Sequence, residues 1–361
     1  MELIPGLPED LARECLSRVP YQQFPAVGAV CKDWKAEIDS PGFLSQRKSA
    51  GQCQALVVLV QARPNPIGKY CSPGLKNMHP PIFLPTVFEP LSGRWADLPS
   101  PPGCCDGLPR FCRLAAVGTD LVVVGGLDPV TWDVTNSVYV YSFLSSEWRR
   151  GADMPGGDRF LFGCASDDDR LVFVAGGHDK QKNSLRSAMA YDVHMDRWVQ
   201  MPDMARERDE CRGTFRGGKF LVISGYGTEA QGKYDRSVEA FDTAKWSWDP
   251  VEENVLEADT TPRACVDGEG DDALYTCRNR SRDIAALRGS TWTPVAELPS
   301  DVASQSHVMR WRRKLLVFGY GSGCKPDGVS VLDLCSNNKW TKVEIPEEFR
   351  GTVDEGWVLE I

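Results

Sequence analysis

The sequence lacks the features that would place the chain in a membrane or on a secretory route. Its 361 residues contain no apolar run of the roughly 18 residues that a membrane-spanning helix requires. The opening residues Met1-Glu2-Leu3-Ile4-Pro5 show no basic stretch followed by a long apolar one, so no secretory signal is predicted. We therefore expect a protein of the cytoplasm, the nucleus or both, with no membrane partner.

Metal-ligand spacings and a dominant positive charge are also missing. The four histidines, at positions 79, 178, 194 and 307, lie apart, and the 13 cysteines include no Cys-x-x-Cys pair. Because the cysteines are scattered and odd in number, we expect reduced thiols that pack as small apolar side chains. The formal net charge of −9 disfavours nucleic acid as the main partner. No metal, cofactor or nucleic acid is predicted.

No combination of residues indicates catalysis. The acidic run at 167–169 falls where a turn between strands is expected, and Gly217-Gly218-Lys219 precedes a strand without the spacing of a phosphate-binding loop. Both segments are interpreted as turns, and the chain is predicted not to be an enzyme. A metalloenzyme would require stoichiometric metal in the purified protein.

What the sequence does contain is a tryptophan that returns at intervals of 53, 50, 50, 44 and 48 positions. The recurring residues are Trp95, Trp148, Trp198, Trp248, Trp292 and Trp340. In three repeats an aromatic residue followed by an acidic one stands seven positions earlier, as Tyr191-Asp192 does before Trp198. A Leu-Pro, Met-Pro or Ile-Pro pair usually follows the tryptophan. Self-similarity at such a period is typical of a repeat architecture that builds a binding surface.

Each repeat offers four short strands, which favours a propeller blade over a helical solenoid. In the third repeat the expected strands are 161–165, 171–175, 188–191 and 197–200. Paired glycines close the second strand at Gly125-Gly126 and Gly176-Gly177. With the tryptophan and the aromatic-Asp pair they resemble the kelch repeat, most closely over 114–155 and 162–202. We predict a kelch-type propeller of six blades, with seven as the alternative.

The two ends of the propeller region are expected to close the ring together. The first repeat begins with the apolar segment 55–60 and lacks a preceding inner strand, while the strand-like run 356–361 is left over at the C-terminus. Pairing the two would remove both sheet edges. A proline-rich insertion over 63–81 interrupts the first repeat and is either a binding loop or an excursion.

The first 45 residues carry helical periodicity instead. One helix is predicted from Leu7-Pro8-Glu9-Asp10 to Pro20, a second carries apolar residues from Val27 to Ile38, and a third short element lies near Pro41. Such a unit is too small to bury a core alone and leaves an apolar face for a partner. We predict a helical domain over 1–45, a linker over 46–54 and a propeller over 55–361.

The helical pattern resembles the F-box, in Leu7-Pro8-x-x-Leu11, Cys15-Leu16-x-x-Val19-Pro20 and Val30-Cys31-Lys32-x-Trp34. Cys15 departs from the pattern, where isoleucine is more common. The resemblance implies docking on the Skp adaptor of a cullin-RING ubiquitin ligase. A helical cap for the propeller is the alternative. The adaptor-binding residues that the resemblance implies are Leu7, Pro8, Leu11, Cys15, Leu16, Val19, Pro20, Val30, Cys31 and Trp34.

Basic residues recur near the inner strands and in the loops between second and third strands. If they surround the mouth of the channel, they would attract an acidic or phosphorylated peptide; the alternative is solvated loop charge. The candidate target-binding residues are Arg113, Arg159, Lys182, Arg186, Arg212, Arg236, Arg263, Arg280 and Arg310.

Together the two parts predict the substrate-recognition subunit of a Skp-cullin-F-box ubiquitin ligase. From end to end the chain resembles plant F-box/kelch-repeat proteins. The segments Met1-Glu2-Leu3-Ile4-Pro5, Tyr21-Gln22-Gln23-Phe24-Pro25 and Gln46-Arg47-Lys48 look most like the KISS ME DEADLY group. That resemblance implies phenylalanine ammonia-lyase or type-B response regulators of cytokinin signalling as targets. The alternative is a ligase-independent kelch scaffold that binds a regulatory or structural protein.

Overall fold

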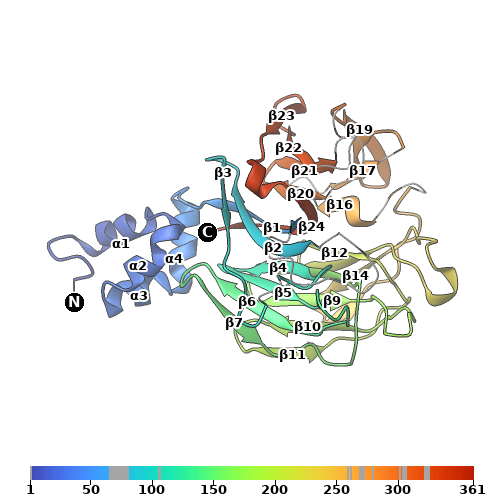
Figure 1. The fold of residues 1–361 in the computed structure, drawn as a ribbon, viewed down its shortest axis with the longest axis horizontal. Helices are drawn as coiled ribbons and strands as arrows, with labels where there is room; N and C mark the ends of the chain where they lie inside the picture. The colour runs from blue at the N-terminus through green and yellow to red at the C-terminus, as the bar shows by residue number, and fades with distance from the viewer. Residues whose placement is uncertain are drawn as a thin grey trace.

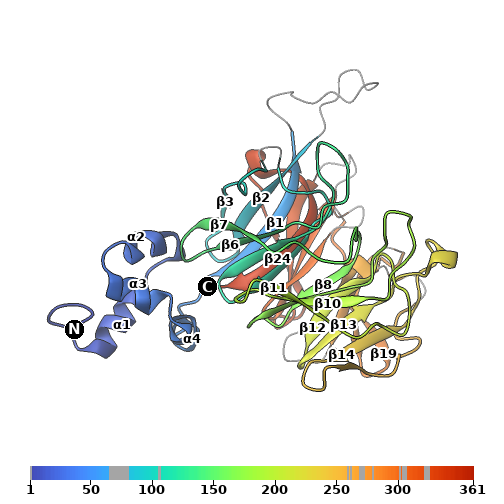
Figure 2. The ribbon, with the colours of Figure 1, turned by 90° about the horizontal axis from the view of Figure 1, so that it is seen from below.

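A computed structural model describes residues 2–64, 81–104, 107–257, 260, 262–267, 273–278, 280–300, 302, 307–320 and 326–361. Most of the proline-rich insertion therefore lies outside the described residues. Helices at the N-terminus sit beside one edge of a β-propeller, and the C-terminus lies at their junction (Figures 1 and 2).

Within residues 2–50 the structure shows four α-helices and one 3₁₀ turn, rather than the three helices expected. They are α1 (Glu9–Ser17), η1 (Tyr21–Gln23), α2 (Phe24–Gly28), α3 (Lys32–Ile38) and α4 (Pro41–Ser49). The prediction of one continuous helix between Val27 and Ile38 is wrong. Cys31 is extended (φ −159°), and its Sγ accepts a hydrogen bond from Trp34 N at 3.4 Å, so it caps a new helix. Helix α4 extends into the segment 46–54.

The propeller has six four-stranded antiparallel blades, as predicted, and the seven-blade alternative is wrong. Blade 1 comprises β24 (Thr352–Glu360), β1 (Ala55–Arg63), β2 (Ile82–Glu89) and β3 (Arg94–Asp97). Blade 2 comprises β4 (Arg113–Val117), β5 (Asp120–Val124), β6 (Val138–Ser142) and β7 (Glu147–Gly151). Blade 3 comprises β8 (Gly163–Ser166), β9 (Leu171–Ala175), β10 (Ala188–Asp192) and β11 (Arg197–Gln200). Blade 4 comprises β12 (Arg212–Arg216), β13 (Lys219–Ile223), β14 (Val238–Asp242) and β15 (Ser247–Trp248). Blade 5 comprises β16 (Cys265–Asp267), β17 (Leu274–Arg278), β18 (Asp283–Arg288) and β19 (Thr291–Glu297). Blade 6 comprises β20 (Val308–Trp311), β21 (Lys314–Tyr320), β22 (Pro326–Asp333) and β23 (Lys339–Val343).

The C-terminal strand closes the ring, as the sequence predicted. Strand β24 is the innermost strand of blade 1 and pairs antiparallel with β1, with Val57 opposite Val358 and Leu59 opposite Gly356. The two ends of the chain therefore form one sheet, in which β1 is paired on both sides, by β24 and by β2. The main difference in the third repeat is at its first strand, which begins at Gly163 rather than at residue 161.

Left-handed backbone explains the paired glycines. Gly176 and Gly177 have φ of +69° and +82°, and a Cβ on either would lie 2.3–2.4 Å from a backbone oxygen, of Arg208 and Phe160 respectively. In blade 4 Ser224 replaces the first glycine, keeps φ at +59° and donates through Oγ to Asp235 O at 2.6 Å. The left-handed turn is therefore retained in blade 4 although the first glycine of the pair is missing from the sequence.

The recurring tryptophans join neighbouring blades. Trp198 donates through Nε1 to Ala152 O of the segment that follows blade 2, at 2.9 Å. Three others donate likewise to the segment that follows the preceding blade: Trp148 to Pro99 O, Trp248 to Pro202 O and Trp292 to Val255 O. Trp340 donates to Glu297 O, at the end of the last strand of blade 5. Trp95 differs, because its Nε1 is buried with no hydrogen-bond partner among the described residues and its ring stacks on Phe88 and on Phe349 beyond blade 6.

Candidate binding surfaces of the helical domain and the propeller

The helices pack on the propeller through a shared apolar core. Tyr21 meets Phe143 edge-to-face, with ring centroids 5.7 Å apart, and its hydroxyl donates to Glu89 at 3.3 Å. Gln22 donates to the same carboxylate at 2.6 Å. Leu16 and Phe24 belong to one buried cluster with residues of blades 1 and 2. The apolar surface that a small helical unit cannot bury alone is therefore partly covered by the propeller.

Arg47 lies at the centre of this junction and is 1% exposed. Its guanidinium donates to the carbonyls of Ser17, Val19 and Gln52, and to that of Ile361 at 3.1 Å. The same group lies over the ring of Phe24, 4.9 Å from its centroid. One side chain thus joins α1, the segment after α4 and the C-terminus.

Some of the residues implied in adaptor binding face solvent and others support the helices from within. Leu11 is 45% and Val30 61% exposed, and Pro8, Cys15, Pro20 and Cys31 are also exposed. Leu16 is buried, whereas Leu7, Val19 and Trp34 are half-buried, and Trp34 Nε1 donates to Leu3 O at 2.6 Å. Exposed apolar residues on α1 and at the break between α2 and α3 are the part of this set that a partner can contact.

A buried carboxylate in the channel connects four blades. Glu355 of β24 is 2% exposed and lies 2.7 Å from Arg113, 3.1 Å from His307 and 3.4 Å from Arg212. Burial alone would raise the pKa of the Glu355 carboxyl, but His307, Arg212 and Arg113 outweigh it and hold that pKa well below its usual range. The cluster holds the closing strand against three other inner strands.

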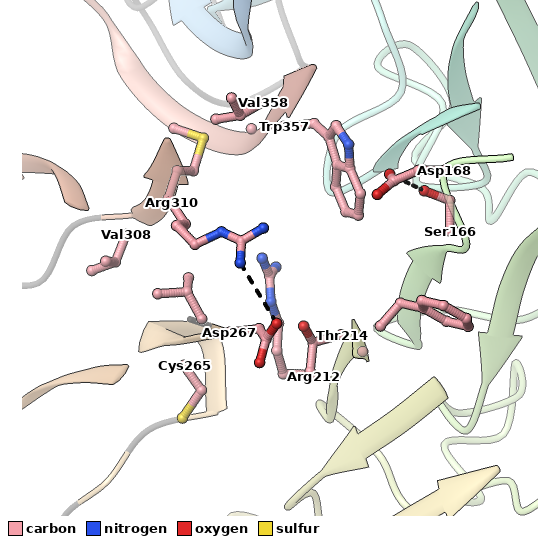
Figure 3. A pocket seen from close by; sticks show the side chains of 15 residues that line it. Ser166, Asp168, Arg212, Thr214, Cys265, Asp267, Val308, Arg310, Trp357 and Val358 are labelled. Atoms are coloured by element: carbon pink, nitrogen blue, oxygen red, sulfur yellow. Dashed lines mark hydrogen bonds and ion pairs between the residues drawn. The ribbon is translucent and has the colours of Figure 1, made fainter. Parts of the chain in front are cut away.

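A cavity of about 140 Å³ lies along this channel. Figure 3 shows the side chains that line it. Trp357 of β24 and Phe215 of β12 line it beside the carboxylates of Asp168 and Asp267. Arg310 lies 3.7 Å from Asp267 across the opening. The charges are largely matched within the wall, so this cavity fits a polar group or water better than a net charge.

The two parts match different protein families. Residues 4–46 match the F-box domain, and residues 109–155 and 159–205 match the Kelch motif. Two Arabidopsis thaliana proteins align with the whole chain over their own whole length. These are F-box/kelch-repeat protein At1g15670, 47% identical over 364 residues, and F-box/kelch-repeat protein At1g80440, 46% identical over 367. The chain belongs to the F-box/kelch-repeat protein family.

The kelch matches coincide with blades 2 and 3, where the sequence resemblance was closest. A solved structure, "Structure of YjhT", superimposes with a TM-score of 0.57 at 15% identity and covers 72% of this chain and 90% of that one. This likeness shows the fold alone. The F-box and the kelch ring together support a general role as a substrate adaptor, binding a Skp-type adaptor at one end and a target at the other. Proteins of this family are adaptors, not enzymes.

The nine basic residues considered for target binding do not form one group in this F-box/kelch-repeat protein. Arg113 and Arg212 contact Glu355 inside the channel, and Arg159 donates to the carbonyls of Gly176 and Ser187. Arg310 lines the cavity of Figure 3. Arg186 pairs with Asp203, and Arg236 donates to Leu256 O. Three exposed residues remain without such a contact in the described part of the chain: Lys182, Arg263 and Arg280.

The structure adds residues that sequence reasoning missed at the loop end of the channel. Trp132, which is 51% exposed, lies in the loop between β5 and β6, and Arg110 and Phe111 precede β4. Trp132 lies off the period of the blade tryptophans, which is the one signal that could have singled it out. The arrangement of Arg110 and Phe111 depends on a backbone geometry that the sequence does not display.

Neither a bilayer-spanning helix nor a metal centre is found in what the structure describes. No helix among the described residues is long and apolar enough to cross a bilayer. The same residues contain no group of three or more His, Cys, Asp or Glu side chains placed to hold a metal ion. Of the ten cysteines that are described, six are buried: Cys53, Cys112, Cys164, Cys211, Cys265 and Cys277.

Proposed function

We propose that this chain is the substrate-recognition subunit of a Skp-cullin-F-box ubiquitin ligase. The observation that carries the proposal is an F-box with exposed apolar residues, fixed to a kelch ring through the buried Arg47 junction. The F-box would hold the Skp adaptor and through it the cullin-RING ligase. The propeller would present a target for ubiquitination and degradation in the cytoplasm or nucleus.

The contribution of this subunit is proximity. Transfer of ubiquitin belongs to the partners, and holding a target near them raises the effective concentration of its lysines. A rigid junction between helices and propeller serves this role, because it fixes the distance and direction between the two bound proteins. On the resemblance to the KISS ME DEADLY group, we propose phenylalanine ammonia-lyase and type-B response regulators as the first targets to test.

A binding assay with purified Skp adaptor tests the proposal. The variants Leu11→Asp and Val30→Asp place a charge on the exposed apolar residues without entering the core, and each should abolish binding. Met195→Asp, at a residue that is 58% exposed in blade 3, is the matched control and should bind as wild type does. Failure of the folded wild-type chain to bind the adaptor would favour the ligase-independent scaffold.

A full-length chain that carries both Leu11→Asp and Val30→Asp can be used to capture target proteins. Removing residues 1–45 would uncover the core shared with Tyr21 and Phe24, so a truncated propeller would bind proteins through that apolar surface. The full-length Leu11→Asp, Val30→Asp chain avoids this. Proteins that it retains under proteasome inhibition, and that accumulate without being ubiquitinated, would be the targets.

A further inference from the structure

The position opposite each recurring tryptophan holds an aromatic ring in blades 1 to 4 but a leucine in blade 5. In each of the four blades this ring belongs to the buried core between its own blade and the preceding one. In blade 5 the residue opposite Trp292 is Leu287. The aromatic pairs of the other blades are Phe88 with Trp95, Tyr141 with Trp148, Tyr191 with Trp198 and Phe241 with Trp248.

A cavity of about 730 Å³ lies between blades 4 and 5, where this ring is missing. Among the described residues, the buried core there contains no aromatic ring, and Trp292 packs against it only half-buried. Protein interiors are close-packed, so a void of this size between two blades exceeds an ordinary packing defect. Its volume lies within the range of roughly 300–1,000 Å³ that is typical of small-molecule sites. Its apolar lining consists of Leu221, Ile223, Val238, Val255, Leu274 and Leu287.

Blade 6 shows how the same leucine can be compensated. Leu332 lies opposite Trp340, as Leu287 does opposite Trp292. In the core between blades 5 and 6, however, Tyr275 of blade 5 supplies an aromatic ring from the facing sheet. The exchange of an aromatic residue for leucine is therefore offset in one interface and leaves a cavity in the other.

The end of the cavity nearest the channel is polar. Thr214 and Asp267 line both this cavity and the smaller one along the channel. Arg216 lies 3.5 Å from Asp267, so the positive charge at this end is already paired with a carboxylate. The Thr214 hydroxyl can donate and accept hydrogen bonds. This end suits an uncharged polar group of a ligand.

The cavity opens to solvent beside its exposed lining residues, Glu252, Asn254 and Ser290. Glu253 lies at the same opening and pairs with Arg206. The Glu252 carboxylate would repel an anion that enters, whereas it can accept a hydrogen bond from a hydroxyl or an amine. The opening therefore selects against negatively charged molecules.

We infer that the cavity between blades 4 and 5 binds a neutral aromatic small molecule of two or more rings. One ring would pack on Leu287 and Val238, in the place that the ring of Tyr191 takes in blade 3, and a single ring would leave most of the volume empty. A hydroxyl or amine group would reach Thr214 or Glu252. The molecule would join the two blades as aromatic side chains join the others. Neither the Skp adaptor nor a target takes part in this site, so it lies beyond the proposed function.

Titration of the full-length chain with N-phenyl-1-naphthylamine tests this assignment. This neutral dye has three rings and one N–H, and it fluoresces in apolar surroundings. We expect saturable binding of one dye per chain and a higher melting temperature in its presence. The sulfonated relative 8-anilinonaphthalene-1-sulfonate should bind about tenfold or more weakly, because its charge would lie near Glu252 or lose its water inside the cavity. Equal binding of the two dyes would overturn the choice of a neutral ligand.

Two variants fill the cavity from different sides. Leu287→Phe restores the ring that blades 1 to 4 carry, and Val255→Phe adds a ring at the opposite wall. Each should weaken binding of the neutral dye about tenfold or more. Met195→Phe, at an exposed residue of blade 3, is the matched control and should bind as wild type does. The Leu11→Asp, Val30→Asp chain should also bind as wild type does, which shows that the dye does not occupy the F-box.

Thermal unfolding without dye tests whether the space is empty. Leu287→Phe should raise the melting temperature by filling a cavity, whereas Leu332→Phe, the same change in the filled interface, should lower it by overpacking. A lower melting temperature for Leu287→Phe, no saturable binding to the wild type, or equal binding in all variants would overturn the site. Skp binding should be unchanged in Leu287→Phe. A chain that binds the dye here but fails to bind the adaptor would overturn the proposed function and leave this site standing.

Discussion

The guanidinium of Arg47 donates a hydrogen bond of 3.1 Å to the main-chain carbonyl of Ile361, the last residue of the chain. Gln54 and Ile361 are also bonded to each other through both backbone groups, at 2.7 and 3.0 Å. The strand that closes the propeller therefore ends in the joint that holds the helices. Because the two parts share this joint, we expect the F-box and the ring to unfold together rather than as separate domains.

Replacing Arg47 by methionine should lower the free energy of unfolding by more than about 3 kcal/mol. The change keeps a long side chain but leaves several buried carbonyls without donors, each worth about 1–3 kcal/mol. Thermal and urea unfolding should shift as one transition, monitored by far-UV circular dichroism for all elements and by tryptophan fluorescence mainly for the propeller. Lys48→Met, at an exposed neighbour, is the control. A separate early helical transition with an unchanged propeller would contradict the shared joint.

The tryptophan period predicted the blade count because each of those side chains is a joint between blades, and a joint is needed wherever two blades meet. The glycine pairs were a weaker guide. Ser224 shows why, since its hydroxyl supports the same left-handed turn. The helix break at Cys31 was missed because a thiol is an uncommon cap.

Side-chain roles could be predicted less well than elements, because they depend on partners that are distant in the sequence. Arg113 was considered for target binding, but its counterion Glu355 lies 242 positions away and reaches it only through ring closure. Arg47 lies in a polar segment that resembles a linker, and only the packing of four segments buries it. Arg110 was not considered, because nothing in its neighbourhood marks the turn that places it beside Phe111.

Gly177→Ala should destabilise the propeller by several kcal/mol, and Gly217→Ala by only about 1–2 kcal/mol. Both glycines have positive φ, which alone costs an alanine about that smaller amount. At Gly177 the added methyl would also lie 2.4 Å from Phe160 O, whereas nothing lies within 4 Å at Gly217. Equilibrium unfolding of the two variants measures the difference. Equal losses would mean that backbone conformation, not the close approach, explains the paired glycines.

The same substitution at two tryptophans should have different effects. Trp198→Phe removes the hydrogen bond to Ala152 O and should cost about 1–2 kcal/mol, since the carbonyl also loses its partner. Trp95→Phe loses ring volume but removes an Nε1–H that is buried with no acceptor in the part of the chain that the structure describes, so the two effects oppose each other. We expect a net change within about 1 kcal/mol. Urea unfolding of both variants tests this, and a larger loss at Trp95 than at Trp198 would contradict the role of the hydrogen bonds.

Glu355→Gln should weaken ring closure at neutral pH and remove part of the acid sensitivity of the chain. The variant leaves Arg113 and Arg212 without their buried counterion, a change that typically costs about 3–5 kcal/mol. The pKa of the Glu355 carboxyl lies well below its usual range in the folded chain, because the neighbouring arginines and His307 outweigh the effect of burial. The folded state therefore binds this proton less readily than the unfolded state does. Its stabilisation is present above the ordinary glutamate pKa, about 4.3, and is lost as the pH falls through the folded value.

The measurement is the free energy of unfolding in urea between neutral and acidic pH for the wild type, Glu355→Gln and the exposed control Glu348→Gln. The difference between wild type and Glu355→Gln should be constant near neutrality and shrink on acidification below the glutamate range. The control should follow the wild type throughout, because its carboxylate is solvated in both states. If the difference stays constant down to the acid limit of folding, Glu355 is held by packing rather than by its charge, and the ion cluster is not what secures β24.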